Sequence, residues 1–297
     1  MSFARIVTAM ITPFDAQGEV ALDVAERLAS WLVERGNDGL VICGTTGEGP
    51  TLSSDEKLAM FRAAKHAVGN RARIVANTGS NDTRSSVDIT KEAEACGVDA
   101  VLAVVPYYNK PTQDGMLTHF GAIAQATNLP VFIYNIPGRS SVNMQTQTLL
   151  ELARRHDNIA GVKESSGDFN QFAAILANRR AGFTFWCGDD HLYLPSLALG
   201  ADGVVGVATH LCSREFIAMG EALRAGNIDK AAFIHCSLAP LFAALFATTS
   251  PIAIKWAMSR LGFGAGVTRS PLGSMPPELM LRLEPLLEPY REKAAAR

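Results

Sequence analysis

The sequence predicts a (β/α)₈ barrel, the TIM-barrel arrangement, followed by a C-terminal helical appendage. Three observations carry that prediction: a helix-to-strand junction that occurs three times, eight apolar strand candidates that alternate with helical patterns, and the end of strand signals beyond Gly226. The chain has 297 residues, 48% hydrophobic and 19% charged, which is enough for one large domain or two of ordinary size.

The repeated junction joins the end of a helix to the start of a buried strand. It reads ERGNDGLVI, EACGVDAVLAV and LALGADGVVGV, each with Gly, any residue, Asp, a small residue and then a Val- or Leu-rich run. Gly36, Gly97 and Gly200 suit the left-handed residue just past a helix end. The runs that follow are apolar on both faces, as buried parallel strands are.

With that junction as a guide, the chain contains eight alternating strand and helix units. The clearest helix is predicted to begin with a capping box made by Ser53 and Glu56 and to end at Gly69. Eight such units favour a closed barrel over an open sheet. The strands are expected near residues 5–11, 39–44, 73–77, 100–106, 130–135, 158–163, 183–187 and 203–207.

Beyond the barrel the pattern is helical only. Helices are expected at 229–247, 252–261 and 276–293, separated by Pro251, Gly262 and Pro276-Pro277. We therefore expect a catalytic barrel over residues 1–225 and a C-terminal helical region over 226–297.

Composition and charge exclude several classes of protein. A formal net charge of −2 and a pI near 6.3 provide no basic footprint for nucleic acid or an anionic membrane. The longest strongly apolar run, Leu238 to Ala247, is shorter than a membrane span. The first residues are interpreted as a strand rather than a signal peptide. Five cysteines without a CxxC pair favour reduced thiols over disulfides or a zinc site. We expect a soluble, cytoplasmic protein.

Polar side chains gather where the predicted strands end, which is where such barrels carry their chemistry. The sequence contains no HExxH motif, no histidine pair at metal spacing and no Walker motif. The polar residues at strand ends are Thr45, Thr46, Glu48, Asn77, Thr78, Tyr107, Tyr108, Asn109, Tyr134, Asn135, Arg139, Lys163, Glu164, Asp189 and Asp190.

Lys163 stands where the sixth strand calls for another Val or Ile. One interpretation is a strand-end lysine whose amine extends to solvent. The other is an amine inside the barrel, where loss of hydration favours the neutral form, and a neutral amine can attack a carbonyl to form a Schiff base. Position at the end of a strand favours the second interpretation without deciding between them.

Three further features allow both a functional and a structural interpretation. Tyr134 is suited to shuttle protons to a carbinolamine, or is a core tyrosine. Thr45 and Thr46, in GTTGEG, could hold a carboxylate or relay protons, or form an ordinary polar turn. Arg139 could bind a carboxylate with both its guanidinium nitrogens, or lie on the surface.

The run Asp189-Asp190-His191 suggests a metal site, but acidic residues at a strand-to-helix turn more often cap the helix. We therefore expect no metal here.

Together these residues resemble the dihydrodipicolinate synthase family, also called 4-hydroxy-tetrahydrodipicolinate synthases. That family belongs with N-acetylneuraminate lyase to the pyruvate-dependent class I aldolases. The resemblance runs through most of the chain, and seven motifs in family-like order make it specific. They are TPFD, GTTGEGPTL, PYYNKPTQDGMLTHF, YNIPGRS, GVKESSGD, CGDD and PIAIKWAM.

The resemblance implies catalytic roles for four residues. Lys163 would form the Schiff base with pyruvate. Tyr134, Thr45 and Tyr108 would form a hydroxyl proton relay, with Tyr108 reaching in from a neighbouring subunit. The assembly implied is a homotetramer built from two tight dimers.

Four further residues would bind the substrates. Thr46 would hold the pyruvate carboxylate, and Arg139 would bind the carboxylate of L-aspartate-4-semialdehyde. Gly188 and Val205 would offer backbone groups near the site. The implied reaction condenses the two substrates on the path to diaminopimelate and lysine, with no metal or organic cofactor.

Other functions remain open at this point. Arg139 and the Tyr107-Tyr108 pair favour the synthase over another pyruvate-dependent aldolase or dehydratase, such as an N-acetylneuraminate lyase-like enzyme or a 2-keto-3-deoxy sugar acid aldolase. A non-catalytic pyruvate-binding barrel would be expected to have lost part of the catalytic set. A phosphate-binding barrel using the Gly203–Gly206 loop lacks a flanking basic residue.

One departure from the family concerns regulation. Lysine-inhibited members carry a glutamate where this chain has Ser85, and histidines where it has Ser54 and Lys57. A bound lysine needs an anion near its amine, so the departure predicts weak or absent inhibition by lysine.

Overall fold

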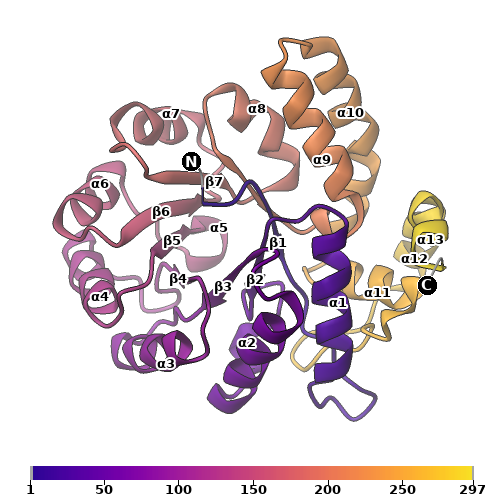
Figure 1. Ribbon diagram of the computed structural model, residues 1–297, viewed down its shortest axis with the longest axis horizontal. Coiled ribbons are helices and arrows are strands. Elements are labelled where there is room, and N and C mark those ends of the chain that lie inside the picture. The colour runs from indigo at the N-terminus through magenta and orange to yellow at the C-terminus, as the bar shows by residue number, and fades with distance from the viewer. Residues whose placement is uncertain (1–2, 296–297) are drawn as a thin grey trace.

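The computed structural model describes residues 3–295 and consists of a closed barrel of eight parallel strands, β1 to β8 in chain order. Helices surround the strands, and the C-terminal helices lie to one side (Figure 1). The strands are β1 (Ile6–Ala9), β2 (Gly39–Ile42), β3 (Arg73–Asn77), β4 (Ala100–Val104), β5 (Val131–Asn135), β6 (Ile159–Glu164), β7 (Thr184–Cys187) and β8 (Gly203–Gly206).

The barrel helices follow the strands, and several short ones occupy the loops. They are α1 (Leu22–Glu34), η1 (Gly49–Thr51), α2 (Ser54–Val68), α3 (Thr83–Ala95), α4 (Gln113–Gln125), α5 (Pro137–Ser140), α6 (Thr146–Arg155), α7 (Phe169–Asn178), η2 (Asp190–Leu192), α8 (Tyr193–Ala198) and α9 (Thr209–Arg224).

The predicted strands and the (β/α)₈ barrel are confirmed, with small differences at the strand ends. β1 is shorter than predicted: the Met10 N–H still donates to the Val41 carbonyl at 3.0 Å, but the Ile11 N–H donates to His210 Nε2 at 3.2 Å instead of to a strand. The capping box of Ser53 and Glu56 is present at the start of α2.

The repeated helix-to-strand junction also makes a hydrogen bond that the sequence did not predict. Gly36, Gly97 and Gly200 have the expected positive φ. The Asp two residues later accepts a backbone N–H from the strand before it: Asp38 from Ile6 at 2.7 Å, Asp99 from Ile74 at 2.9 Å and Asp202 from Phe185 at 2.8 Å.

Asn158 occupies the equivalent place before β6. Its amide donates to the carbonyls of Ala124 and Thr127, at 2.8 and 3.0 Å, in the segment that leads into β5. Each of the four even-numbered strands is thus preceded by a side chain that binds backbone at the amino end of the preceding unit.

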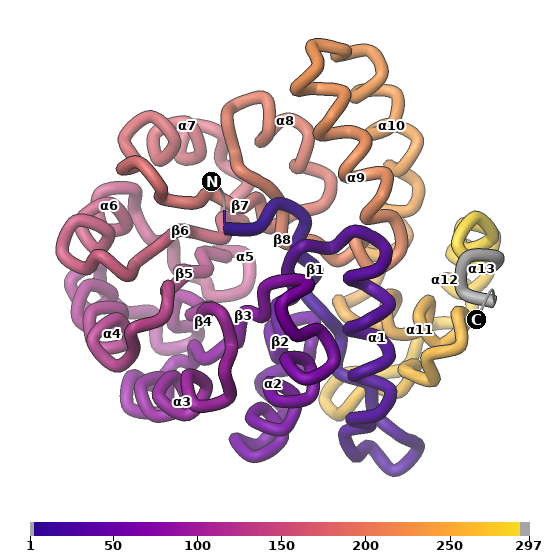
Figure 2. The backbone as a smooth tube through the Cα atoms, in the orientation of Figure 1, coloured from indigo at the N-terminus to yellow at the C-terminus, as the bar shows by residue number. Residues whose placement is uncertain are grey.

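Aromatic side chains fill the amino end of the barrel interior. The rings of Phe132 and Trp186 stack with centroids 4.2 Å apart, and Trp186 Nε1 donates to the Ala4 carbonyl at 2.7 Å. A Cβ at Gly161 would lie 2.8 Å from the Phe132 ring, so glycine makes room for it. In Figure 2 the indigo N-terminal segment runs beside β7 and β8.

The C-terminal appendage contains α10 (Ile228–Leu245), α11 (Ile252–Met258), the π-helical η3 (Ser259–Phe263), α12 (Pro277–Leu283), the 3₁₀ turn η4 (Glu284–Leu287) and α13 (Glu288–Ala295). The expected helix at 276–293 is broken into three pieces because Pro285 and Pro289 lack the N–H that a continuous helix needs. The division of the chain at residue 225 stays a prediction.

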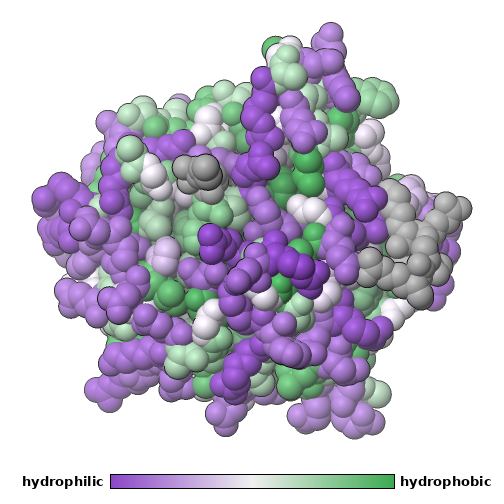
Figure 3. All heavy atoms as spheres, viewed as in Figure 1, coloured by the Kyte–Doolittle hydropathy of each residue, from purple (hydrophilic) through white to green (hydrophobic). Residues whose placement is uncertain are grey.

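One helix, α10, is long and apolar enough to cross a membrane by length and composition alone, with a mean hydropathy of 1.4. It packs against α9, and the helix also carries Asp229 and Lys230 in its first turn. The face of the molecule in Figure 3 is mainly hydrophilic, with hydrophobic side chains in small groups.

Candidate active site

Lys163 lies inside the barrel beside Tyr134. The two residues are register partners on β6 and β5, so their side chains project from neighbouring strands toward the same space. Each is 5% exposed, and Lys163 Nζ lies 4.0 Å from the centroid of the Tyr134 ring. Lys163 therefore does not extend to solvent, and the amine faces an aromatic surface and the barrel interior.

Gly188 allows backbone to approach this lysine closely. A Cβ at Gly188 would lie 3.1 Å from Lys163 Cε and 1.8 Å from Ser165 Oγ, which no side chain could occupy. The Ser165 hydroxyl is buried and makes no hydrogen bond among the described residues. Sequence reasoning missed Ser165, although strand alternation places it two residues after Lys163, on the same side of the chain.

Thr45 and Thr46 lie in a tight loop after β2. Cys43 and Glu48 bracket the pair with φ values of 57° and 53°, a left-handed conformation that is uncommon outside glycine. Thr46 is 5% exposed, and Thr45 is half-buried. A Cβ at Gly49 would lie 2.2 Å from the Cys43 carbonyl oxygen, so the loop can close this tightly only with glycine there.

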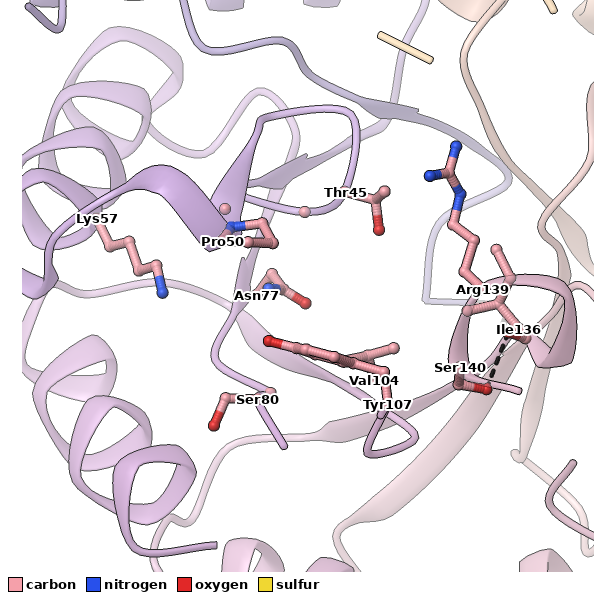
Figure 4. A pocket seen from close by; sticks show the side chains of 13 residues that line it. Thr45, Pro50, Lys57, Asn77, Ser80, Val104, Tyr107, Ile136, Arg139 and Ser140 are labelled. Atoms are coloured by element: carbon pink, nitrogen blue, oxygen red, sulfur yellow. Dashed lines mark hydrogen bonds between the residues drawn. The ribbon is translucent and has the colours of Figure 1, made fainter. Parts of the chain in front are cut away.

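A cavity of about 230 Å³ opens beside these residues. Figure 4 shows Thr45 and Asn77 pointing into it, the Tyr107 ring lying across it, and Lys57 and Arg139 at opposite ends. Val104, the register partner of Tyr134, also lines the cavity, whereas Tyr134, Lys163 and Thr46 are not among its lining residues. The lining is Gly44, Thr45, Gly49, Pro50, Lys57, Asn77, Gly79, Ser80, Val104, Tyr107, Ile136, Arg139 and Ser140.

Ser80 and Ser140 in this lining were not among the predicted residues; Ser80 lies in the loop after β3, and Ser140 is the last residue of α5. Arg139 belongs to α5, which follows β5 directly, and its side chain is exposed at the mouth. Val205 is on β8, 1% exposed, and faces the barrel interior.

Tyr108 is separated from the other predicted residues within a single chain. Its side chain is 87% exposed, and its φ is 72°, so the backbone is held in a left-handed conformation while the ring projects outward. One chain therefore does not bring Tyr108 and Lys163 together.

Buried carboxyl groups surround the lysine strand. Burial raises the pKa of Glu164, whose oxygens accept hydrogen bonds from Asn135 Nδ2 at 3.0 Å and from the Ser166 N–H at 2.8 Å. Burial also raises the pKa of Asp189, and the charges of His191 and Lys163 oppose that rise. These contacts fix the strand end on which Lys163 sits.

The expected helix cap at Asp189-Asp190 is wrong in its detail. Asp190 does not cap its own turn; its Oδ2 accepts the backbone N–H groups of Val207 and Ala208, at 3.2 and 2.9 Å, before α9. Burial raises the pKa of Asp190 to about 7. Within residues 3–295 no group of three or more His, Cys, Asp or Glu side chains is placed to hold a metal ion.

Comparison with known sequences gives a consistent result. The chain is 50% identical over 272 residues to a 4-hydroxy-tetrahydrodipicolinate synthase of Moorella thermoacetica, covering 92% of this chain and 93% of that protein. It is 44% identical over 289 residues to 4-hydroxy-tetrahydrodipicolinate synthase 1 of Halalkalibacterium halodurans, covering 97% and 98%.

Solved structures agree with the sequence relatives. The dihydrodipicolinate synthase of Cyanidioschyzon merolae, crystallised with lysine bound, superimposes with a TM-score of 0.94 at 43% identity, over 96% of this chain and 97% of that one. The enzyme of Aquifex aeolicus gives 0.94 at 38% identity, over 97% and 98%. The model of the dihydrodipicolinate synthetase family matches residues 2–289. The chain therefore belongs to the dihydrodipicolinate synthetase family.

Proposed function

We propose that this protein is a 4-hydroxy-tetrahydrodipicolinate synthase, a lyase that condenses pyruvate with L-aspartate-4-semialdehyde in lysine and diaminopimelate biosynthesis. The observation that carries the proposal is the buried amine of Lys163, 4.0 Å from the Tyr134 ring, in a barrel that also has a cavity lined by Thr45 and Arg139. The two relatives described above, 50% and 44% identical to this chain, bear that name.

Lys163 is the nucleophile of the proposed reaction. Its Nζ adds to the C2 carbonyl of pyruvate, and loss of water gives an imine. Removal of a C3 proton moves an electron pair into an enamine, whose C3 attacks the aldehyde carbon of the acceptor. The acceptor's amine then replaces Lys163 at C2, closing the ring and freeing the enzyme. Tyr134, Thr45 and Tyr108 carry the protons, and no metal or organic cofactor takes part.

The substrate-binding roles are those that the resemblance to the family implies. The Thr46 hydroxyl and neighbouring backbone hold the pyruvate carboxylate, and Gly188, where a Cβ would lie 3.1 Å from Lys163 Cε, and Val205 offer backbone groups. Arg139, at the mouth, binds the acceptor carboxylate, which a neutral sugar aldehyde would not offer. This favours the synthase over a sugar acid aldolase or a lyase of N-acetylneuraminate.

Two alternatives from other classes are less well supported. A phosphate held after β8 would need the N–H groups of Val207 and Ala208, which the Asp190 carboxylate already occupies. A non-catalytic pyruvate-binding barrel would have no use for a tyrosine against the lysine amine.

We also propose that the protein works as a homotetramer of two tight dimers in the cytoplasm, without nucleic-acid or membrane partners. Tyr108 is exposed and held in a fixed conformation, as expected of a residue that enters a partner's site. Ile228 and Phe233 on α10 and Phe246 just after it are 67, 75 and 43% exposed, so apolar side chains are available there for contact with another subunit.

The Schiff base is tested by trapping. Incubation with pyruvate and sodium borohydride is expected to give a stable adduct that peptide mass spectrometry maps to Lys163, and Lys163→Arg is expected to abolish it. Lys57→Arg is the matched control, because Lys57 lines the same cavity and its loss leaves the adduct intact. A folded wild-type protein that forms no adduct contradicts the proposed mechanism.

The role of Arg139 is tested with Arg139→Gln. Loss of a charged hydrogen bond of about 1.5–3 kcal/mol lowers kcat/KM for L-aspartate-4-semialdehyde about 10- to 100-fold. Pyruvate adduct formation is expected to be unchanged, since Lys163 is untouched. Arg154→Gln, on the surface of α6, serves as control. Equal kcat/KM in Arg139→Gln and wild type would remove Arg139 from acceptor recognition.

The sharing of Tyr108 between subunits is tested by mixing two inactive variants, Tyr108→Phe and Lys163→Arg. A mixed dimer holds one site with Lys163 of the first chain and Tyr108 of the second, so activity is expected to return on subunit exchange. Each variant alone, taken through the same exchange, is the control. If Tyr108 acted within its own chain, no mixture would recover turnover.

Weak or absent inhibition by lysine follows from Ser54, Lys57 and Ser85. Lys57 places a cation at the cavity, and the Ser85 hydroxyl donates to Asp82 at 2.6 Å rather than offering an anion. Initial rates are expected to stay constant up to low-millimolar lysine. A clear fall in rate at that concentration refutes the prediction.

A further inference from the structure

The structure buries an ion pair that the proposed chemistry does not use. Lys255, on α11, places Nζ 2.5 Å from Glu48 Oε1, and neither side chain has exposed surface. The second Glu48 oxygen accepts the Arg269 backbone N–H at 2.9 Å. Removing two charges from water offsets most of their attraction, so stability alone is a weak explanation for such a pair.

The pair lies where the appendage meets the barrel loops. Lys255 Nζ is 4.0 Å from the centroid of the Phe14 ring, and the Arg269 guanidinium carbon is 4.4 Å from it. Arg269 also forms an ion pair with Glu56, at 2.5 Å. Burial lowers the pKa of Lys255 to about 8, and the neighbouring carboxylate opposes that shift. The N-terminal loop with Phe14, the loop with Glu48 and the C-terminal segment with Lys255 and Arg269 thus meet at this ion pair.

Glu48 belongs to the loop that carries Thr45 and Thr46, so the ion pair holds that loop. The Glu48 N–H donates to the Thr45 carbonyl at 3.1 Å, and the Gly49 N–H donates to the Gly44 carbonyl at 3.0 Å. Glu48 itself has a φ of 53°. A non-glycine residue keeps that conformation only where its surroundings hold it, and here the side chain is held at both oxygens.

We propose that Glu48 and Lys255 are positioning residues for the pyruvate end of the site: the C-terminal helices hold the Thr45–Thr46 loop in its working shape through this ion pair. The proposal rests on the proposed function, in which Thr45 relays protons and Thr46 binds the pyruvate carboxylate. Arg139 lies on α5, a separate segment, so recognition of the acceptor does not depend on the pair.

The test is the double variant Glu48→Gln/Lys255→Met, which removes both charges together and leaves none unpaired. We expect the KM for pyruvate to rise about 10-fold and kcat to fall by a similar factor, since small misplacements of binding groups have effects of up to about 100-fold. The KM for L-aspartate-4-semialdehyde is expected to be unchanged. The matched control, Arg260→Met/Glu284→Gln, removes a more exposed ion pair within the appendage and is expected to leave both constants as in wild type.

The outcomes separate positioning from stability. A pair that only stabilises would lower the melting temperature and leave the kinetic constants of the folded variant at wild-type values, which overturns the proposal. A rise in both KM values by the same factor also overturns it. If wild type itself forms no borohydride-trapped adduct with pyruvate, the proposed function has failed instead, and the two failures are distinguishable.

A second variant covers the case in which the double variant does not fold. Glu48→Gln keeps the side-chain length and an oxygen toward Lys255, and because burial already lowers the pKa of Lys255 the remaining amine can become neutral rather than stay an unpaired charge. It is expected to give the same pyruvate-specific rise in KM, reduced to a few-fold, while kcat/KM for the aldehyde stays constant. Wild-type values for pyruvate in a folded Glu48→Gln protein overturn the proposal.

Discussion

Closure of eight parallel strands into one barrel is the constraint on which the other features depend. Closure leaves no free sheet edge, and it brings all the strand carboxyl ends to one rim. Because neighbouring strands are in register, Lys163 and Tyr134 face the same interior space. The Lys163 side chain is thereby 5% exposed, buried by the strands around it.

The sequence predicts the barrel well because its signals are local. The positive φ at Gly36, Gly97 and Gly200 and the capping box of α2 depend on residues close in the chain. The hydrogen-bond partners of Asp190 could not be predicted from the sequence. The N–H groups that donate to it lie 17 and 18 residues later in the chain, and only the fold brings them close. Nor does any local pattern show that Lys255 meets Glu48 across 207 residues.

In the candidate site, too, features with a local sequence signal were predicted and features that depend on long-range contacts were not. Position at strand ends was enough to single out Lys163, Tyr134 and Arg139. Ser165 escaped notice because a serine in a turn is unremarkable until Gly188 is seen against it. The exposure of Tyr108 depends on the conformation of the loop after β4, where its φ is 72°, and no periodicity in the sequence encodes that. Left-handed φ values at Cys43 and Glu48 are likewise imposed by tertiary contacts, not by residue preference.

The side chains that precede the even-numbered strands link the strands of the barrel in pairs, in addition to the regular hydrogen bonds between all neighbouring strands. Asp38, Asp99, Asn158 and Asp202 bind backbone of the preceding strand or of the segment leading into it, so β1 is tied to β2, β3 to β4, β5 to β6 and β7 to β8. Other side chains cross the boundaries between these pairs: Asn77 Nδ2 donates to the Cys43 carbonyl at 3.1 Å, and Arg180 Nη2 to the Ile159 carbonyl at 3.1 Å. The four links that precede the even-numbered strands all lie at the amino ends of the strands, opposite the rim that carries Lys163. The end of the barrel that these links stabilise is therefore separate from the end on which the candidate site lies, so loops at the rim can vary without disturbing them.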